Sequence, residues 1–265
     1  MTEKRRRRVL AVVNQKGGVG KTTTAVNLGT ALAAVGRKVL LIDLDAQGNA
    51  STGLGLSSED RRSSTYDVLT GNLPLVETIH RTSVPGLDIS PASAELSGVD
   101  LEIAEEPRRA HLLLDALAVE SDPTHDYVII DCPPSLSLVT INAMTAASAV
   151  LVPLQCEFYA LEGLSQLLRT IERVRGALNP ALTIQGIVLT MYDARNRLSG
   201  QVAQDVREHM GDVVYKTVIP RNVRISEAPS HGKPALLYDH ACAGSQAYIQ
   251  LASELLRRER DLIAA

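Results

Sequence analysis

The sequence contains no tryptophan, a single phenylalanine and only 3% aromatic residues, so its core must be built from aliphatic side chains. Its cysteines, Cys132, Cys156 and Cys242, are widely spaced and form no C-x-x-C pair, which argues against a disulfide framework or a zinc site. No stretch of about 18 apolar residues is present, so we expect no transmembrane helix. A charged N-terminus without an apolar stretch behind it is not a signal peptide. These absences favour a cytoplasmic protein.

The net charge is also low, at −3 over 265 residues, and does not by itself indicate a nucleic-acid binder. Its distribution is uneven: residues 1–8 carry one lysine and four arginines against Glu3, a net of +4, which leaves −7 for the rest (−3 less +4). We interpret residues 1–8 as a basic N-terminal tail, either simply solvated or an arm for DNA or another anionic surface. Residues 9–265 show no repeat or long linker, which predicts a single domain.

Apolar strand-like runs alternate with helical patterns along the whole chain. Strands are expected at residues 9–13, 38–45, 86–93, 127–134, 149–155, 184–193 and 213–220. Helices are expected at residues 22–35, 65–70, 75–78, 138–147, 161–178, 201–209 and 246–263, with two further helical stretches before residue 117. Residues 46–64, rich in Gly, Ser and Asn, are expected to be a loop or switch region. The alternation predicts an α/β fold with a doubly wound, mostly parallel sheet flanked by helices.

The stretch VVNQKGGVGKTTT, residues 12–24, nearly matches the phosphate-binding pattern G-x-x-x-x-G-K-[ST]. It ends correctly at Gly20, Lys21 and Thr22, but Gln15 stands where the first glycine belongs, and Lys16 adds a second lysine. Glycines allow backbone N–H groups to point at phosphate oxygens, and the following helix N-terminus favours anions. Lys21 would neutralise the β- and γ-phosphates, and the Thr22 hydroxyl would bind Mg²⁺. The loop therefore predicts a P-loop NTPase-like site of the deviant Walker A kind.

Carboxylates follow two of the expected strands, where ligands bind in such folds. Asp131 ends the run VIID and occupies the place of a Walker B aspartate, which holds Mg²⁺. Asp43 and Asp45 end the neighbouring strand, and one of them orienting the attacking water is the simplest interpretation. A dinucleotide site is the alternative, with Gly18 and Gly20 as its glycines and Asp43 on a ribose, but the third glycine is replaced by Thr23.

Four motifs together resemble the ParA/Soj chromosome-partitioning ATPases of the deviant Walker A class: KGGVGKTT, LLIDLDAQGNAS, VIIDCPPSLS and IPRNVRISEAPSHGKP. The resemblance covers nearly the whole chain. It implies ATP and Mg²⁺ as cofactors, slow ATP hydrolysis, and an ATP-dependent sandwich homodimer that binds double-stranded DNA nonspecifically on the nucleoid. It also implies a ParB-like centromere-binding partner that stimulates hydrolysis, and no membrane. The chain starts at the first strand, without the helix-turn-helix extension of larger relatives, so operator binding is not implied.

The same resemblance assigns roles to individual residues. Lys16 would reach the partner subunit's phosphates, as an arginine finger does elsewhere, and would act in catalysis with Lys21 and Asp45. The implied nucleotide-binding residues are Lys16, Gly17, Gly18, Val19, Gly20, Lys21, Thr22, Thr23, Pro220 and Asn222. The implied metal-binding residues are Thr22, Asp131 and Asp43, and the implied DNA-binding residues are Arg195 and Arg224. The family usually has proline after Asp45, where this chain has Ala46, which loosens the switch loop.

Three other functions share the phosphate loop. A MinD-like membrane ATPase would use residues 246–263 as an amphipathic membrane helix, although a helix that closes the core has the same apolar stripe. An iron–sulfur carrier would need cysteine ligands, but Cys132 lies next to Asp131 and Cys156 has no partner cysteine nearby. A nucleotide-gated scaffold would bind ATP without hydrolysing it.

Overall fold

A computed structural model of the chain describes residues 7–119 and 124–264. One eight-stranded sheet runs through it in the order β3-β4-β2-β5-β1-β6-β7-β8. Neighbouring strands are parallel, except that β3 is antiparallel to β4. The strands are β1 (Arg8–Val12), β2 (Val39–Asp43), β3 (His80–Arg81), β4 (Leu87–Ser90), β5 (Tyr127–Asp131), β6 (Ala149–Gln155), β7 (Thr183–Tyr192) and β8 (Val214–Pro220).

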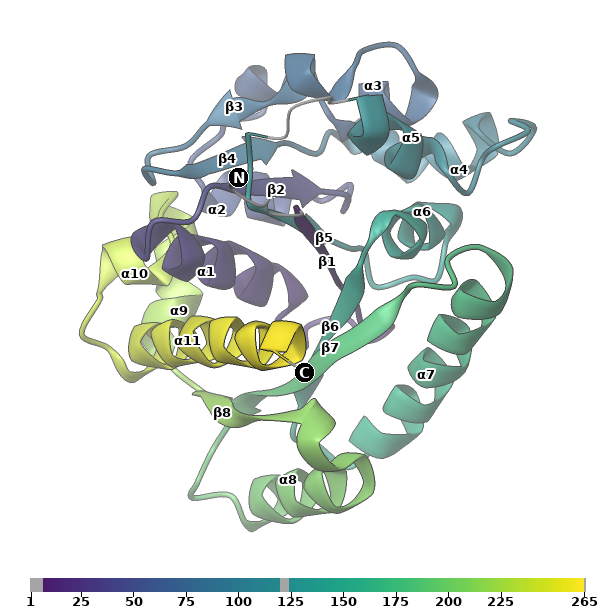
Figure 1. Cartoon of the computed structure of the whole chain (residues 1–265). Coiled ribbons are helices and arrows are strands. Elements are labelled where there is room, and N and C mark those ends of the chain that lie inside the picture. The colour runs from purple at the N-terminus through teal and green to yellow at the C-terminus, as the bar shows by residue number, and fades with distance from the viewer. Residues whose placement is uncertain (1–6, 120–123, 265) are drawn as a thin grey trace.

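Helices cover both faces of the sheet, with α1 and α11 on one face and α6 and α7 on the other (Figure 1). The α-helices of the described residues are α1 (Lys21–Ala34), α2 (Asn49–Gly53), α3 (Thr65–Thr70), α4 (Val99–Glu102), α5 (Leu112–Val119), α6 (Leu138–Ala146), α7 (Ala160–Ala177), α8 (Arg197–Met210), α9 (Val223–Glu227), α10 (Ala235–Tyr238) and α11 (Ala243–Ala264). The short 3₁₀ turns used below are η1 (Glu59–Arg61) and η5 (Ala228–His231). This architecture confirms the predicted doubly wound α/β fold.

The central strands are buried on both faces because helices cover both sides of the sheet. Every residue of β2 and β5 is buried, including the aspartates that end them. The last helix, α11, packs on α1 and β8 and buries Tyr248, Leu251 and Leu255 to 1% exposure or less. Packing against the core therefore explains the apolar stripe of α11, so the stripe does not by itself indicate a membrane helix. No helix of the described residues combines the length and apolarity needed to span a bilayer.

Several elements of the structure differ from the predictions. Residues 46–64 were expected to be a loop, but α2 lies within them. Its sequence NASTG has poor helix propensity, yet Ala50 and Ser51 are buried against the rest of the molecule, so tertiary contacts override propensity. The edge strand β3 was missed because two residues carry no detectable alternation. Helix α8 begins at Arg197 rather than residue 201, since the Asn196 side chain accepts a hydrogen bond from the Leu198 N–H at 3.0 Å and caps it.

The predicted basic tail is shorter than residues 1–8. Arg8 is the first residue of β1, and its guanidinium contacts Glu259 at 3.1 Å and Gln185 at 2.7 Å. Arg7 donates a hydrogen bond to the Leu117 carbonyl at 2.6 Å. These two arginines therefore tie β1 to the surrounding elements instead of extending into solvent. Residues 1–6 of the expected tail lie outside the described residues, and the assignment of residues 9–265 to one domain stays a prediction.

Candidate nucleotide site

The glycine-rich loop connects β1 to the N-terminus of α1 at the carboxyl edge of the sheet (Figure 1). Gly18 and Gly20 have φ angles of 74° and 87°, in the left-handed region where a side chain would strain the backbone. Gly20 is also the N-cap of α1, so the first N–H groups of that helix open toward the loop. Such a loop at a helix N-terminus is a binding site for phosphate.

Two polar residues outside the motif fix the loop. The Asn14 amide donates to the Pro153 carbonyl on β6 at 2.8 Å, while its oxygen accepts the Lys16 N–H at 3.0 Å. The Thr190 hydroxyl on β7 donates to the Val19 carbonyl at 2.8 Å. The loop is thereby held to two neighbouring strands. Neither anchor was predicted from the sequence. For Asn14, the position of a polar residue directly after an apolar strand could have indicated such a contact.

The two lysines of the loop point in different directions. Lys21 is 6% exposed, and its ammonium donates to the Lys16 carbonyl at 3.0 Å, so it lies inside the loop. Burial lowers the pKa of Lys21, and the nearby Asp131 carboxylate opposes that shift. The Lys16 side chain is half exposed and forms an ion pair with Glu157, which follows β6. Lys16 is therefore directed away from the interior of its own loop.

Asp131 and Asp43 end adjacent parallel strands and are register partners. The Asp43 carboxylate is directed to the segment after β2: it accepts hydrogen bonds from the Ser51 N–H and hydroxyl at 3.0 and 2.7 Å and from the Asp45 N–H at 3.2 Å. Burial raises the pKa of Asp43 to about 6. With these bonds made, Asp43 organises α2, and both of its carboxylate oxygens already accept hydrogen bonds from the segment that follows β2.

Both Asp131 oxygens are fully buried and lack a hydrogen-bond partner of good geometry among the described residues. Burial, followed by the charge of Asp43, raises the pKa of Asp131 well above its usual range, while the Thr22 hydroxyl lowers it. A buried carboxylate without partners is costly unless a ligand completes it. Mg²⁺ suits this place because it binds through one or two carboxylates, waters and nucleotide phosphates rather than through a protein cage. No cluster of three metal-ligating side chains occurs in the described part of the chain.

Asp45 follows the end of β2 and is partly exposed. Its side chain accepts the Gln47 N–H at 3.0 Å, and its carbonyl accepts the Gly48 N–H at 2.8 Å. The carboxylate thus sits in a tight turn beside the buried pair Asp43 and Asp131, at the edge where the phosphate loop also lies. This placement suits a group that contacts water beside the γ-phosphate.

Pro220 and Asn222 lie at the carboxyl end of β8, which is three strands from β1 in the sheet, beyond β6 and β7. The backbone there is tied to β7, because the Arg221 N–H donates to the Tyr192 carbonyl at 3.0 Å. Asn222 is the N-cap of α9, and its side-chain oxygen accepts the Arg224 N–H at 2.9 Å. The Asn222 amide group is left to donate to a ligand. Strand β7 lies between β6 and β8 and carries Met191. Among the described residues, Met191 is the only non-glycine residue with a positive φ, which is 50°.

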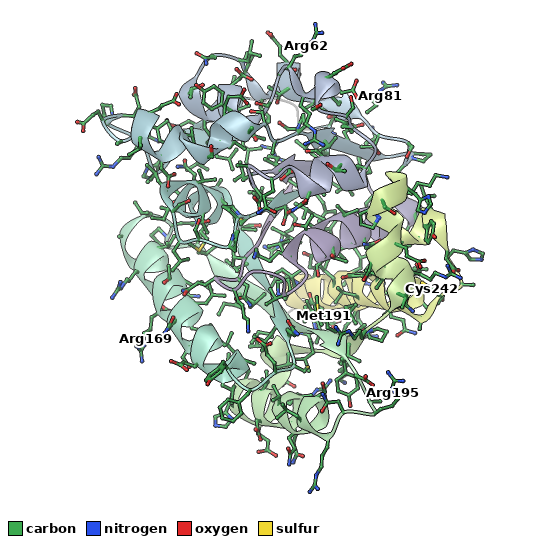
Figure 2. All side chains as sticks on the ribbon, turned by 180° about the vertical axis from the view of Figure 1, so that it is seen from behind. Arg62, Arg81, Arg169, Met191, Arg195 and Cys242 are labelled. Carbon is green, nitrogen blue, oxygen red and sulfur yellow. The ribbon has the colours of Figure 1, made fainter. Side chains whose placement is uncertain are left out.

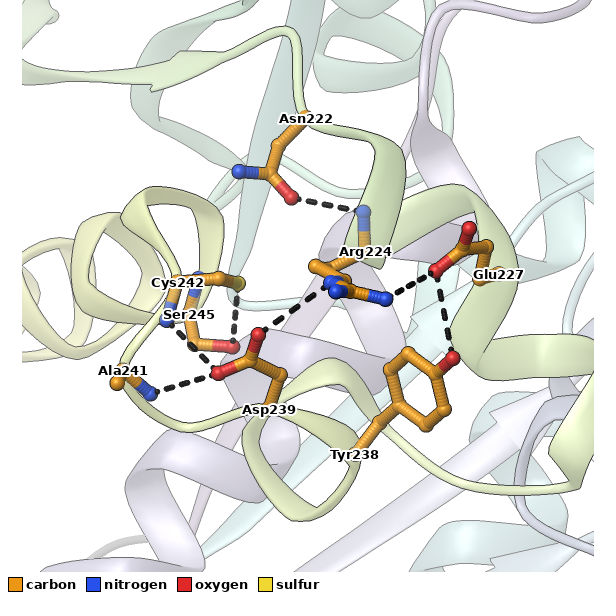
Figure 3. A network of polar contacts seen from close by, with 8 residues as sticks. All are labelled: Asn222, Arg224, Glu227, Tyr238, Asp239, Ala241, Cys242 and Ser245. Carbon is orange, nitrogen blue, oxygen red and sulfur yellow. Dashed lines mark hydrogen bonds and ion pairs between the residues drawn. The ribbon is translucent and has the colours of Figure 1, made fainter.

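The two DNA-binding candidates are exposed but paired with acids. The Arg195 side chain is 90% exposed and binds Asp193 at 3.0 Å. Arg224 contacts Glu227 at 3.0 Å and Asp239 at 3.5 Å (Figure 3). The Asp239 carboxylate is itself held in place by the N–H groups of residues 241 and 242. Each arginine thus has a local competitor for any phosphate that approaches it.

The three cysteines are free thiols in different surroundings. Cys132 and Cys156 are buried free thiols, and burial raises the pKa of Cys132 well above its usual range and that of Cys156 to about 11. Cys242, the third, donates to the Ser245 hydroxyl at 3.3 Å near Asp239 (Figure 3).

A family model described as an AAA domain matches residues 7–184. Over 255 residues the chain is 66% identical to the chromosome partitioning protein ParA of Caulobacter vibrioides, covering 96% of both chains. It is 52% identical over 249 residues to the sporulation initiation inhibitor protein Soj of Bacillus subtilis, covering 94% of this chain and 98% of the other. Among solved structures, the cobyrinic acid a,c-diamide synthase of Mycobacterium smegmatis with bound ATP analog and magnesium matches with a TM-score of 0.84, 39% identity and 96% coverage of both chains.

Proposed function

The chain belongs to the ParA/Soj family of chromosome-partitioning ATPases, and we propose that it segregates DNA through an ATP-dependent cycle of dimerisation and DNA binding. It is an ATP hydrolase that uses ATP and Mg²⁺. The loop, Lys21 and Thr22 hold the phosphates, and Asp131 with Thr22 holds the metal ion, which neutralises charge on the transferred phosphoryl group. Pro220 and Asn222 line the adenine.

The observation that carries this proposal is the divergence of the two lysines. Lys21 lies within the loop and can neutralise the phosphates of the same subunit. Lys16 extends from the loop surface to Glu157, with which it forms a partly exposed ion pair. In a dimer that sandwiches two nucleotides, Lys16 would leave Glu157 and contact the partner subunit's phosphates. ATP binding and dimerisation would then be one event, and Lys16 would stabilise transition-state charge in trans.

Hydrolysis is proposed to depend on Asp45. A water molecule attacks the γ-phosphorus, the bond to the β-γ bridging oxygen breaks, and ADP and phosphate are the products. Asp45 orients that water, since its carboxylate lies beside the phosphate loop and is partly exposed. Basal turnover is expected to be slow, because only Lys16 supplies a finger and it must first leave Glu157. A ParB-like centromere-binding protein would accelerate turnover.

DNA binding is proposed to be independent of sequence and to require the ATP dimer. Arg195 and Arg224 are exposed, but each is already paired with an acid in a chain of negative net charge. A dimer would present four such arginines together, and affinity through phosphates grows with the number of simultaneous contacts. The protein would then reside in the cytoplasm on the nucleoid while bound to ATP, and leave it after hydrolysis.

Measuring the oligomeric state with ATP, with ADP and without nucleotide tests the cycle. We expect a dimer with ATP only, a persistent ATP dimer for Asp45→Ala, and ATP binding without dimerisation for Lys16→Ala. An ATP-dependent dimer of Lys16→Ala would rule out the trans role of that lysine. Normal phosphate release by Asp45→Ala would remove Asp45 from the mechanism and leave a nucleotide-gated scaffold as the better description.

The DNA step has its own test, in which affinity is measured against salt for unrelated sequences. Four arginine–phosphate contacts would give a slope of log K against log[salt] of roughly −3.6, at about −0.9 per contact. Arg224→Ala should weaken binding equally on every sequence and flatten that slope, without affecting ATP dimerisation. Equal affinity with ADP and ATP, or unchanged affinity of the Arg195→Ala, Arg224→Ala double variant, would contradict the model.

A further inference from the structure

Arg61, in η1, reaches back over the segment that follows Asp45. One terminal nitrogen of its guanidinium donates to the Thr52 hydroxyl at 2.7 Å and to the Leu56 carbonyl at 2.7 Å. The Thr52 hydroxyl in turn donates to the Gly48 carbonyl at 3.0 Å. The guanidinium therefore connects Thr52, near the C-terminal end of α2, with Leu56, and through the Thr52 hydroxyl with Gly48, the residue before α2.

The other terminal nitrogen of Arg61 lies against Gly48. Gly48 is buried, has a φ of 61°, and is the N-cap of α2. A Cβ built on Gly48 would collide with this nitrogen and lie 3.3 Å from the Arg61 Cζ, so the close approach requires glycine. The Gly48 N–H donates to the Asp45 carbonyl at 2.8 Å. Arg61 thus contacts the residue that closes the turn holding Asp45.

This placement of an arginine is costly. Its Nε is buried without a hydrogen-bond partner in the part of the chain that the structure describes. Nor does Arg61 form an ion pair with a carboxylate among those residues. Partial burial of a cation without a counterion is unfavourable. A smaller polar side chain could bond Thr52 at lower cost, but it could not cover Gly48 at the same time.

We propose that Arg61 is a positioning residue for ATP hydrolysis: it holds the turn of Asp45 to Gly48 in one conformation, so that the Asp45 carboxylate is fixed beside the γ-phosphate. The inference rests on the proposed function, in which Asp45 orients the attacking water. The restraint by Arg61 also explains how this loop can be ordered with Ala46 in place of the proline that is usual in the family. A proline there would restrict the backbone of the loop directly, whereas Arg61 restrains this loop from outside.

The test compares turnover and ATP affinity of Arg61→Ala, Arg61→Lys and the control Arg62→Ala. Arg62 is the next residue, is exposed and points out from the surface (Figure 2). We expect Arg61→Ala to lower kcat roughly ten- to hundredfold, because small displacements of a reacting group have effects of this size. ATP affinity should stay within about twofold, since the phosphate loop is untouched. Arg61→Lys should recover only part of kcat, because lysine lacks the planar fork. Arg62→Ala should behave as wild type.

A rescue experiment separates positioning from general stability. Ala46→Pro in the Arg61→Ala background should restore kcat several-fold by limiting the loop's conformations. It should change little in the wild-type chain. An Arg61→Ala variant with unchanged kcat, or one in which kcat and ATP affinity fall together with the melting temperature and proline restores nothing, overturns the inference. Asp45→Ala, measured alongside, distinguishes this from failure of the proposed function, which would appear as undiminished turnover in that variant.

Discussion

Lys21 and Arg195 carry the same charge in opposite surroundings. Lys21 is 6% exposed and lies near Asp131, a buried carboxylate that lacks a hydrogen-bond partner of good geometry among the residues the structure describes. The Arg195 side chain is 90% exposed and is neutralised by Asp193. The phosphate loop therefore lies beside buried ionisable groups, Lys21 and Asp131, whose burial is costly to the free protein. The arginine face is already neutralised, so a single phosphate contact there gains little.

This difference explains why nucleotide would control DNA binding and not the reverse. A ligand that completes buried, unpaired groups has a large differential free energy, which is what shifts a conformational equilibrium. An exposed arginine that leaves its carboxylate for a DNA phosphate changes its interaction free energy little, because both ion pairs are weak in water. Substitutions that alter one region at a time should therefore have effects that decrease from the phosphate loop to the arginine face.

The largest effect is expected for Lys21→Ala. Removing one member of a buried charged set costs about 3 kcal/mol or more, which corresponds to roughly a hundredfold or greater loss of ATP affinity. Calorimetry or fluorescent-nucleotide binding would measure it. Lys16→Ala is the matched control, since it removes an exposed lysine from the same loop and should bind ATP normally. Equal losses of ATP affinity in the two variants would show that Lys16 and Lys21 contribute equally to nucleotide binding.

Next in size is the effect of Asp131→Asn on the free protein. The pKa of Asp131 is raised by burial and by Asp43, so the folded state holds this proton more tightly than the unfolded state. The resulting stability is present at low pH and is lost as pH rises from about 4 through the raised pKa. The variant, which never carries the buried charge, should melt a few degrees higher at about pH 8 and show a flatter dependence on pH.

Magnesium completes this test. Mg²⁺ and ATP together should stabilise the wild-type protein much more than Asp131→Asn, because the variant lacks the carboxylate that we propose holds the metal ion. The prediction fails if the variant melts lower than wild type without nucleotide, or if magnesium protects both proteins equally. Either outcome would mean that Asp131 is satisfied within the fold.

A smaller effect is expected for Glu157→Gln, which releases Lys16 from its ion pair. Partly exposed pairs contribute about 0.2–1 kcal/mol, so the protein concentration needed for half dimerisation with ATP should fall by roughly up to fivefold. Analytical ultracentrifugation over a concentration series would show it. Glu162→Gln removes the same charge from an exposed position on α7 and should have no effect. Weaker dimerisation of Glu157→Gln would show that Glu157 belongs to the interface itself.

The sequence alone predicted every strand of the sheet except β3, although β2, β4 and β5 end earlier than predicted. Strands such as β5 are short apolar runs buried on both faces, and Asp131 and Asp43 end their strands in a position that the alternation of elements already implies. The phosphate loop was equally clear, because its glycines and Lys21 follow a strand and open a helix. These features depend on local pattern, which one sequence contains.

Contacts between distant segments could not be predicted in this way. Glu157 lies 141 positions from Lys16 along the chain, and nothing in either local pattern refers to the other. Helix α2 was missed for the same reason, since its poor helix formers are held by Asp43 and Arg61. The acids beside Arg224 were visible in the sequence, but only the turn at Asp239 brings that carboxylate back to the arginine (Figure 3).

The smallest effect, and the most direct probe of the arginine face, is expected for Asp239→Asn. Asparagine can keep the side-chain oxygen that accepts the N–H groups of residues 241 and 242, while it removes the negative charge 3.5 Å from Arg224. A phosphate would then face one competitor, Glu227, instead of two. DNA affinity of the ATP dimer should rise by roughly two- to fivefold, in keeping with about 0.5–1 kcal/mol for an exposed pair. The increase should be equal on unrelated sequences, because phosphates carry no sequence information. Glu105→Gln makes the same charge change at an exposed position after α4 and controls for net charge. If both variants bind DNA more tightly by the same factor, the increase in affinity comes from the change in net charge. Asp239 would then not compete with DNA phosphates for Arg224.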